Sequence, residues 1–199
     1  MKRLLIEAEK DRRYRWRLLL VFIFPVILFF FGEVIKTHMC FLGLTIRLLS
    51  LIVLMLINFR LWLIVRTNSV VSVGIFIWLT GICIQILGIL YGDAIVFLGS
   101  MAEIVISLKA FFRFRNSHVK FYFFIIPILI MAQFLLLTGY FYNGNFPGIY
   151  FIHILNILIG LFVVLLAVHP TIYEKENKSY LFLLVIMSIK LISVISFFF

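Results

Sequence analysis

Charged side chains are scarce in this chain of 199 residues. Only 13% of the residues are aspartate, glutamate, lysine or arginine, whereas 65% are hydrophobic. A soluble domain has about a quarter charged and about half apolar residues. The composition therefore excludes a soluble enzyme, a disordered tail and a collagenous chain, and it indicates a polytopic membrane protein. Because a membrane-spanning helix takes about 20 residues, about seven spans would use nearly the whole chain and leave no room for a soluble domain.

Residues that build disulfide scaffolds, metal sites and common catalytic centres are equally few. The two cysteines, Cys40 and Cys83, lie in apolar segments without a CxxC pattern or a His/Cys cluster. This arrangement argues against a disulfide scaffold and a zinc site, and both thiols are most simply packing residues. The sequence also has no GxSxG, HExxH or P-loop pattern, the signatures of several enzyme classes. We therefore expect no metal and no cofactor.

Long apolar runs make up most of the chain, separated by short segments of turn or charge character. The runs are continuously apolar and lack the two-residue alternation of a barrel strand, so they predict α-helices. The sequence thus predicts an all-α fold, a polytopic membrane bundle of about seven transmembrane helices. The seven runs cover residues 18–35, 40–64, 70–91, 93–112, 119–142, 149–168 and 180–199.

Lysine and arginine are distributed unevenly between the two ends of the predicted spans. With the amino terminus in the cytoplasm, 15 of the 18 basic residues fall on the cytoplasmic side and only Lys36 falls on the other. The remaining two, Arg47 and Lys190, lie inside spans. By the positive-inside rule this split predicts an N-in, C-out orientation. We expect residues 1–17 to be a basic cytoplasmic tail and residues 18–199 to be a single seven-helix transmembrane domain.

The net charge of +10 takes its meaning from this placement. Basic residues along a membrane surface contact anionic lipid headgroups, whereas nucleic-acid-binding proteins gather them in a basic patch or domain. The predicted partners are the lipid bilayer, with anionic headgroups at the cytoplasmic face, and a lipid ligand or another membrane subunit, but not nucleic acid. The predicted location is the bacterial cytoplasmic (inner) membrane. Residues 4–16 are expected to form one amphipathic interfacial helix.

Eight polar residues lie within the predicted spans or at their edges. A charged group inside a span costs about 2.5–3.5 kcal/mol on insertion, so each such group is a functional candidate. The eight are Arg47, Gln85, Asp93, Glu103, Gln133, His153, Asn156 and Lys190. At the helical rise of about 1.5 Å per residue, most of them lie in the non-cytoplasmic half or near the membrane centre. This placement favours a small polar pocket that opens to the non-cytoplasmic side.

A structural interpretation of the same residues stays open. Arg47 or Lys190 can pair with Glu103 and hold the helices in register as an ionic lock. A lone intramembrane histidine such as His153 is more often a hydrogen-bonded packing residue than a metal ligand, because metal sites need several ligands.

Glycine recurs every seven residues in the third predicted span, at Gly74, Gly81 and Gly88. Gln85 and Gly92 continue the same stripe. Small residues let neighbouring helices approach closely, so the stripe predicts helix packing. We expect this span to be central in the bundle.

Three segments carry a family resemblance. Residues 90–93 (Leu-Tyr-Gly-Asp) close a span, residues 146–150 (Phe-Pro-Gly-Ile-Tyr) open another, and residues 184–188 end in serine. With their spacing, over about residues 70–199, they resemble the Leu-Gly-Asp, Pro-Val-x-x-Tyr and Ser-Asp segments of the lysoplasmalogenase-like (YhhN-type) membrane protein family. The resemblance implies a lipid hydrolase that uses two intramembrane aspartates.

The chain departs from that family at important positions. The Ser-Asp pair becomes Ser188-Ile189, the last of the family's eight spans is absent, and so is the histidine of its fourth span. Of the two implied aspartates only Asp93 remains. Glu103 follows it by ten residues, which is about 15 Å along a helix, and hydrolysis by an acid and a base needs both near one water.

Three functions are compatible with these observations. The first is a non-catalytic or catalytically degenerate inner-membrane protein that acts as a subunit, sensor or scaffold, with Arg47, Glu103 and Lys190 as an internal lock. The second is a lysoplasmalogenase-like lipid hydrolase with Asp93, Glu103 and His153 as its catalytic residues. The third is a small-solute transporter, although the chain shows no inverted repeat of broken helices.

Overall fold

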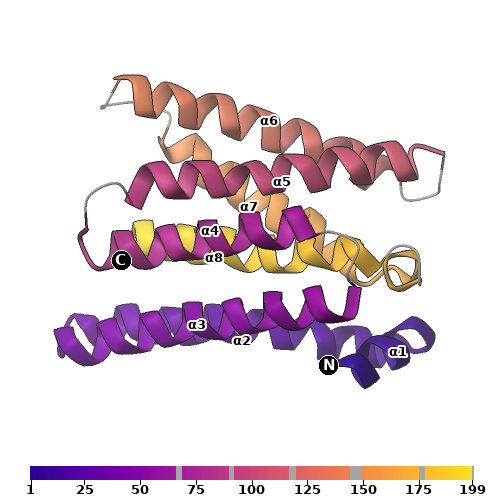
Figure 1. Ribbon diagram of the computed structural model, residues 1–199, viewed down its shortest axis with the longest axis horizontal. Helices are drawn as coiled ribbons and strands as arrows, with labels where there is room; N and C mark the ends of the chain where they lie inside the picture. The colour runs from indigo at the N-terminus through magenta and orange to yellow at the C-terminus, as the bar shows by residue number, and fades with distance from the viewer. Residues whose placement is uncertain (66–68, 90–91, 117–119, 144–148, 175–177, 199) are drawn as a thin grey trace.

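The computed structural model describes residues 1–65, 69–89, 92–116, 120–143, 149–174 and 178–198 (Figure 1). Over these residues the chain is almost entirely helical and forms no β-strand. The elements are α1 (Lys2–Lys10), α2 (Arg12–Lys36), α3 (Cys40–Val65), α4 (Ser69–Ile86), α5 (Gly92–Phe114), α6 (Lys120–Asn143), α7 (Ile149–Ala167), the 3-10 helices η1 (Pro170–Tyr173) and η2 (Lys178–Leu181), and α8 (Phe182–Phe198).

Seven helical segments of the described chain are long and apolar enough to cross a membrane. They correspond to α2 through α8 and to the seven apolar runs of the sequence. In a bilayer a helix satisfies its own backbone hydrogen bonds, which explains why apolar runs of this length fold in this way. The prediction of an all-α membrane bundle with seven spans is confirmed.

The amino-terminal segment differs from its prediction. Residues 4–16 do not form one helix, because the backbone at Asp11 is extended and its carboxylate accepts a hydrogen bond from the Arg13 amide at 2.9 Å. Such a cap starts a new helix, and α2 therefore begins at Arg12 and includes the last six residues of the predicted tail. The apolar side of α1 faces protein instead of lipid, with Leu5 and Ala8 buried and the helix packed against η1.

Arg15 links α2 to α1 and to the segment around η1. Its side chain donates hydrogen bonds to the backbone carbonyls of Ala8 and Val168, both at 2.8 Å. It also lies over the ring of Tyr173, whose hydroxyl donates to the Ala167 carbonyl at 2.7 Å. Burial raises the pKa of the Tyr173 hydroxyl, and the Arg15 charge offsets only part of this rise. The hydroxyl therefore stays protonated and remains a donor under physiological conditions.

The central helix of the bundle is α8. Every residue from Phe182 to Lys190 is buried, and α8 packs against α2, α3, α4, α5 and α7. Figure 1 shows it running between α2 and α3 below and α5 and α6 above. The span of α8 is 61% buried, against 33% for α4. The expectation that the third span is central is therefore wrong.

The glycine stripe of α4 instead brings this helix close to α5. A Cβ atom added to Gly74 would lie 2.4 Å from the Cβ of Ala102, and one added to Gly81 would lie 2.7 Å from the Val96 amide nitrogen. In return, Gly99 of α5 leaves room for the backbone of Trp78. Gly88 has a different role, because its φ of +69° lies in the left-handed region, which glycine adopts without strain, just past the end of α4.

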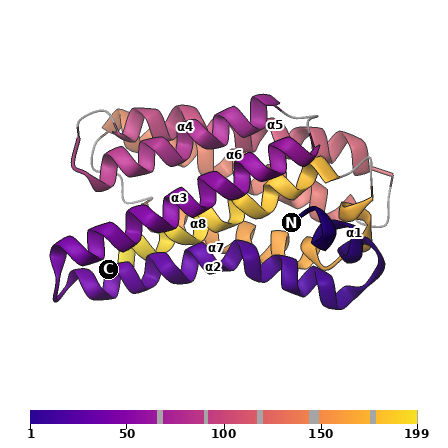
Figure 2. The same cartoon turned by 60° about the horizontal axis from the view of Figure 1, so that its bottom comes forward.

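The two ends of the bundle differ in charge. We call the end with α1, η1 and η2 the basic end, and the end with the α2–α3 connection and the carboxyl terminus the C-terminal end (Figures 1 and 2). The described lysines and arginines lie at or near the basic end, except Lys36, Arg47 and Lys190. Two residues counted in the sequence analysis, Arg66 and Lys175, lie outside the described residues.

Candidate functional site: a polar cavity at the C-terminal end

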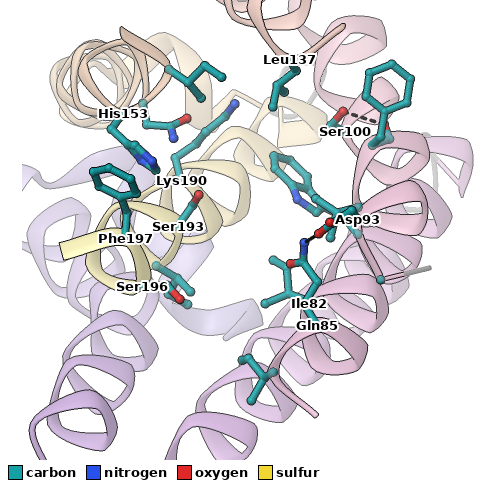
Figure 3. A pocket seen from close by; sticks show the side chains of 18 of the residues that line it. Ile82, Gln85, Asp93, Ser100, Leu137, His153, Lys190, Ser193, Ser196 and Phe197 are labelled. Carbon is teal, nitrogen blue, oxygen red and sulfur yellow. Dashed lines mark hydrogen bonds between the residues drawn. The ribbon is translucent and has the colours of Figure 1, made fainter. Parts of the chain in front are cut away.

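A cavity of about 630 Å³ opens between α3, α4, α5, α6, α7 and α8. Figure 3 shows lining side chains on opposite sides of the cavity, with His153, Lys190 and Phe197 on one side and Asp93 and Gln85 on the other. Seven of the eight predicted polar residues line it: Arg47, Gln85, Asp93, Gln133, His153, Asn156 and Lys190. Packing thus gathers residues that the sequence places on six helices.

The position of each residue along its helix gives its depth. Gln85 and Asp93 lie within one residue of helix ends, so they form the mouth at the C-terminal end. His153 is four residues into α7, which is about 6 Å. Arg47, seven residues into α3, and Lys190, eight residues before the end of α8, both lie about 10–12 Å deep.

The deepest part of the site is an ion pair between α8 and α5. The ammonium of Lys190 lies 2.6 Å from Glu103 Oε2, and both side chains are almost fully buried. Lys190 also donates a hydrogen bond to Gln133 Oε1 and lies 5.3 Å from the centre of the Trp78 ring. The Gln133 amide in turn donates to Asn156 Oδ1 at 2.6 Å. Lys190, and not Arg47, is therefore the partner of Glu103.

A second buried ion pair joins α2 and α3, and sequence reasoning missed its acid. Arg47 Nε lies 3.0 Å from Glu33 Oε1, and Glu33 is only 2% exposed. Lys36, on the next turn of α2, lies 3.4 Å from the other oxygen of Glu33. Glu33 follows Gly32 near the end of the first apolar run, where an acid resembles a residue of the connection between two spans. The useful signal was Arg47 itself, because a buried cation requires a nearby acid.

At the mouth of the cavity, Asp93 accepts a hydrogen bond from a neighbouring helix. The amide of Gln85 donates to Asp93 Oδ1, which joins the end of α4 to the start of α5. Among the described residues that line the cavity, Asp93 is the only carboxylate. Glu103 does not line it, and ten helical residues place it about 15 Å from Asp93 along α5.

His153 lies in the wall of the cavity without the hydrogen bond expected of a packing histidine. Its ring stacks on Phe197, with 3.9 Å between ring centres. The residue is 8% exposed, and its Nδ1 atom is buried with no hydrogen-bond partner in the described part of the chain. Buried polar atoms in proteins are nearly always hydrogen-bonded, so an atom without a partner beside a cavity indicates a place where a ligand can bind.

Further cavity residues were not predicted. Ser100, Ser193 and Ser196 add hydroxyl groups, while Phe97 and Phe197 add aromatic surface. Serine and phenylalanine are common in transmembrane helices, so nothing in the sequence distinguishes these positions. Across the residues that the structure describes, no group of three or more histidine, cysteine, aspartate or glutamate side chains could hold a metal ion.

Comparisons with other proteins add no further assignment: no family model, no curated protein and no solved structure matches the chain. Of the segments that carry the resemblance to lysoplasmalogenase-like proteins, residues 90–91 and 146–148 lie outside the described residues. The family relationship therefore stays a prediction.

Proposed function

We propose that this chain is a non-catalytic membrane protein, a sensor or a subunit of a larger assembly, that binds a small amphiphilic molecule in the cavity. The cavity volume of about 630 Å³ lies within the range of small-molecule sites, about 300–1,000 Å³. Its wall combines apolar side chains with a few polar groups, as is typical of such sites.

The proposal includes an orientation. The basic end faces the cytoplasm of a bacterial cell and contacts anionic lipid headgroups, and the cavity opens on the opposite side of the cytoplasmic membrane. The uneven placement of lysine and arginine supports this orientation, because retained basic residues mark the cytoplasmic side.

The contacts of two carboxylates, Asp93 and Glu103, are the main support for this proposal. Hydrolysis by general acid and base catalysis needs two proton-transfer groups within reach of one water. Asp93 accepts a hydrogen bond from Gln85, and Glu103 is neutralised by Lys190 beneath the cavity. The two acids that the sequence offers thus serve structure, and binding without turnover is the chemistry that remains.

One observation favours a second function. Asp93 and His153 line the same cavity, and a carboxylate with an imidazole is a second acid and base combination. If these two side chains act on one water, the chain is a lipid hydrolase of the lysoplasmalogenase-like type.

Incubation of the purified protein in nanodiscs with a panel of lysophospholipids separates the two functions. We expect at least one lipid to be retained on the protein and recovered unchanged by mass spectrometry. Release of a cleaved chain that Asp93→Asn and His153→Gln abolish would contradict the proposal and establish the hydrolase. Binding that persists in Asp93→Asn, with no product in either protein, would support it.

A further inference from the structure

The cations of the cavity and their counter-ions lie at different places. Arg47 and Lys190 both line the cavity, whereas their acidic partners Glu33 and Glu103 do not. Each pair therefore presents its positive member to the cavity. The one carboxylate in the wall, Asp93, lies at the mouth, while the two cations lie about 10–12 Å deep. The deep part of the cavity is consequently its electropositive part.

Arg47 has hydrogen-bonding capacity to spare. It is 7% exposed, and its buried Nε atom has no hydrogen-bond partner in the described part of the chain. Its ion pair with Glu33 runs through Nε, one of five N–H donors of a guanidinium, and the guanidinium carbon lies 5.4 Å from the centre of the Phe29 ring. Arginine binds carboxylates and phosphates through paired N–H groups.

His153 supplies an independent sign of a ligand. Its buried Nδ1 atom, in the same wall, has no partner among the described residues. A neutral imidazole can carry its proton on this nitrogen and donate it. A buried polar atom without a partner destabilises a protein, so a ligand that accepts this hydrogen bond relieves that destabilisation.

Apolar side chains complete the wall above the cations. Ile82 and Ile86 of α4, Phe97 of α5, Leu137 of α6 and Ile152 of α7 line the cavity. A ligand that fills the space must therefore expose apolar surface to these residues and an anionic group to Arg47 and Lys190. A free inorganic anion would satisfy only the second requirement.

We infer that the cavity binds an amphiphilic organic anion, with its carboxylate or phosphate group held by Arg47, Lys190 and His153. This inference rests on the proposed binding function and specifies the chemical class of the ligand. The bound anion interacts with Arg47 and Lys190 from the cavity side, while Glu33 and Glu103 remain on the opposite side. The apolar body of the ligand packs against α4, α5, α6 and α7.

Four probes that differ in the charge of the headgroup or in the presence of an apolar chain test the inference. Dodecyl phosphate, dodecanol, dodecyltrimethylammonium and inorganic phosphate are titrated onto the protein in phosphatidylcholine nanodiscs, with empty nanodiscs as the blank. We expect dodecyl phosphate to bind at least tenfold more tightly than each of the other three. Dodecanol binding as tightly would overturn the anionic class but leave the proposed binding function intact.

The remaining outcomes are equally decisive. If inorganic phosphate binds as tightly as dodecyl phosphate, the requirement for an apolar body is wrong. Preference for dodecyltrimethylammonium would assign the site to cations and to Asp93. If none of the three amphiphiles binds more to the loaded nanodiscs than to the blank, both the inference and the proposed function fail.

Two substitutions with opposite expected effects distinguish binding from general damage. Arg47→Gln should weaken binding of dodecyl phosphate at least tenfold. Glu33→Gln should strengthen it several-fold, because Arg47 then lacks its acidic partner. Arg60→Gln, an exposed position near the basic end of α3, is the matched control and should change nothing.

A charge-balanced variant keeps the test valid if Arg47→Gln does not fold. Glu33→Gln combined with Arg47→Gln removes both charges together and leaves no unpaired buried ion. It should bind dodecyl phosphate as weakly as Arg47→Gln is expected to. Binding at the level of the unchanged protein in this variant would overturn the role of Arg47.

Discussion

Lys190 and Glu103 form the most deeply buried ion pair of the described residues, with side chains 2% and 3% exposed. A buried charge without a partner is strongly destabilising, whereas a buried pair can be close to neutral. Gln133 and Asn156 extend the pair into a chain of hydrogen bonds that reaches α6 and α7. The pair therefore holds α8 and α5 together and fixes where the Lys190 charge meets the cavity.

Removal of one member of this pair should destabilise the protein markedly. Glu103→Gln leaves the Lys190 ammonium buried without a counter-ion, and we expect a loss of about 3–5 kcal/mol. The double variant Glu103→Gln, Lys190→Met should recover most of the lost stability, since no buried charge remains. Thermal melting in detergent measures the stability of the single and the double variant, with Glu7→Gln on α1 as the control. Equal melting of Glu103→Gln and the unchanged protein would show that the pair does not stabilise the fold.

At the scale of elements, glycine residues allow α4 and α5 to pack closely against each other. Gly74 and Gly81 of α4 and Gly99 of α5 lie where a Cβ would meet the other helix at 2.4–2.7 Å. Small residues allow this approach, which brings the backbones together and increases van der Waals contact. The same contact positions Trp78, whose ring lies beside the Lys190 ammonium.

Gly99→Ala should therefore destabilise the bundle. The new Cβ would lie 2.4 Å from the Trp78 backbone, which cannot move like a flexible side chain. Overpacking of this kind costs about 1–3 kcal/mol. Gly160→Ala on α7 is the matched control, because its nearest neighbours lie at 3.7 and 3.8 Å, and helical glycine is about 0.5–1 kcal/mol worse than alanine. If both variants melt alike, close packing of α4 on α5 does not limit stability.

At the scale of the whole molecule, the two ends of the bundle differ in charge. The basic end carries most lysines and arginines, and the cavity opens at the other end. In the proposed orientation the ligand enters from outside the cytoplasm. The cations at the basic end would then contact the anionic inner leaflet.

Labelling in intact cells tests this orientation. In a background with Cys40→Ser and Cys83→Ser, His38→Cys lies in the α2–α3 connection and Arg115→Cys lies after α5, and both positions are exposed. A membrane-impermeant maleimide should label the first but not the second, and both should react in lysed cells. Labelling of Arg115→Cys alone in intact cells would reverse the orientation and place the cavity mouth in the cytoplasm.

Some features of the site could be predicted and others could not, for physical reasons. A polar residue in an apolar run is conspicuous, so the sequence identified seven residues of the cavity wall and Glu103 beneath it. Glu33 was missed because it lies in the last turn and a half of α2, where an acid resembles a loop residue. The central position of α8 was also missed, because an apolar helix facing lipid and one facing protein have the same composition.

The sequence by itself determined the class of the molecule and its number of long apolar helices. A bilayer requires long apolar segments and penalises unpaired backbone groups, so composition alone leads to a bundle of seven spans. Only the tertiary structure decided which opposite charges meet. Glu103 and Lys190 are far apart in the chain, and so are the walls of the cavity; their contacts depend on helix packing, which no local pattern encodes.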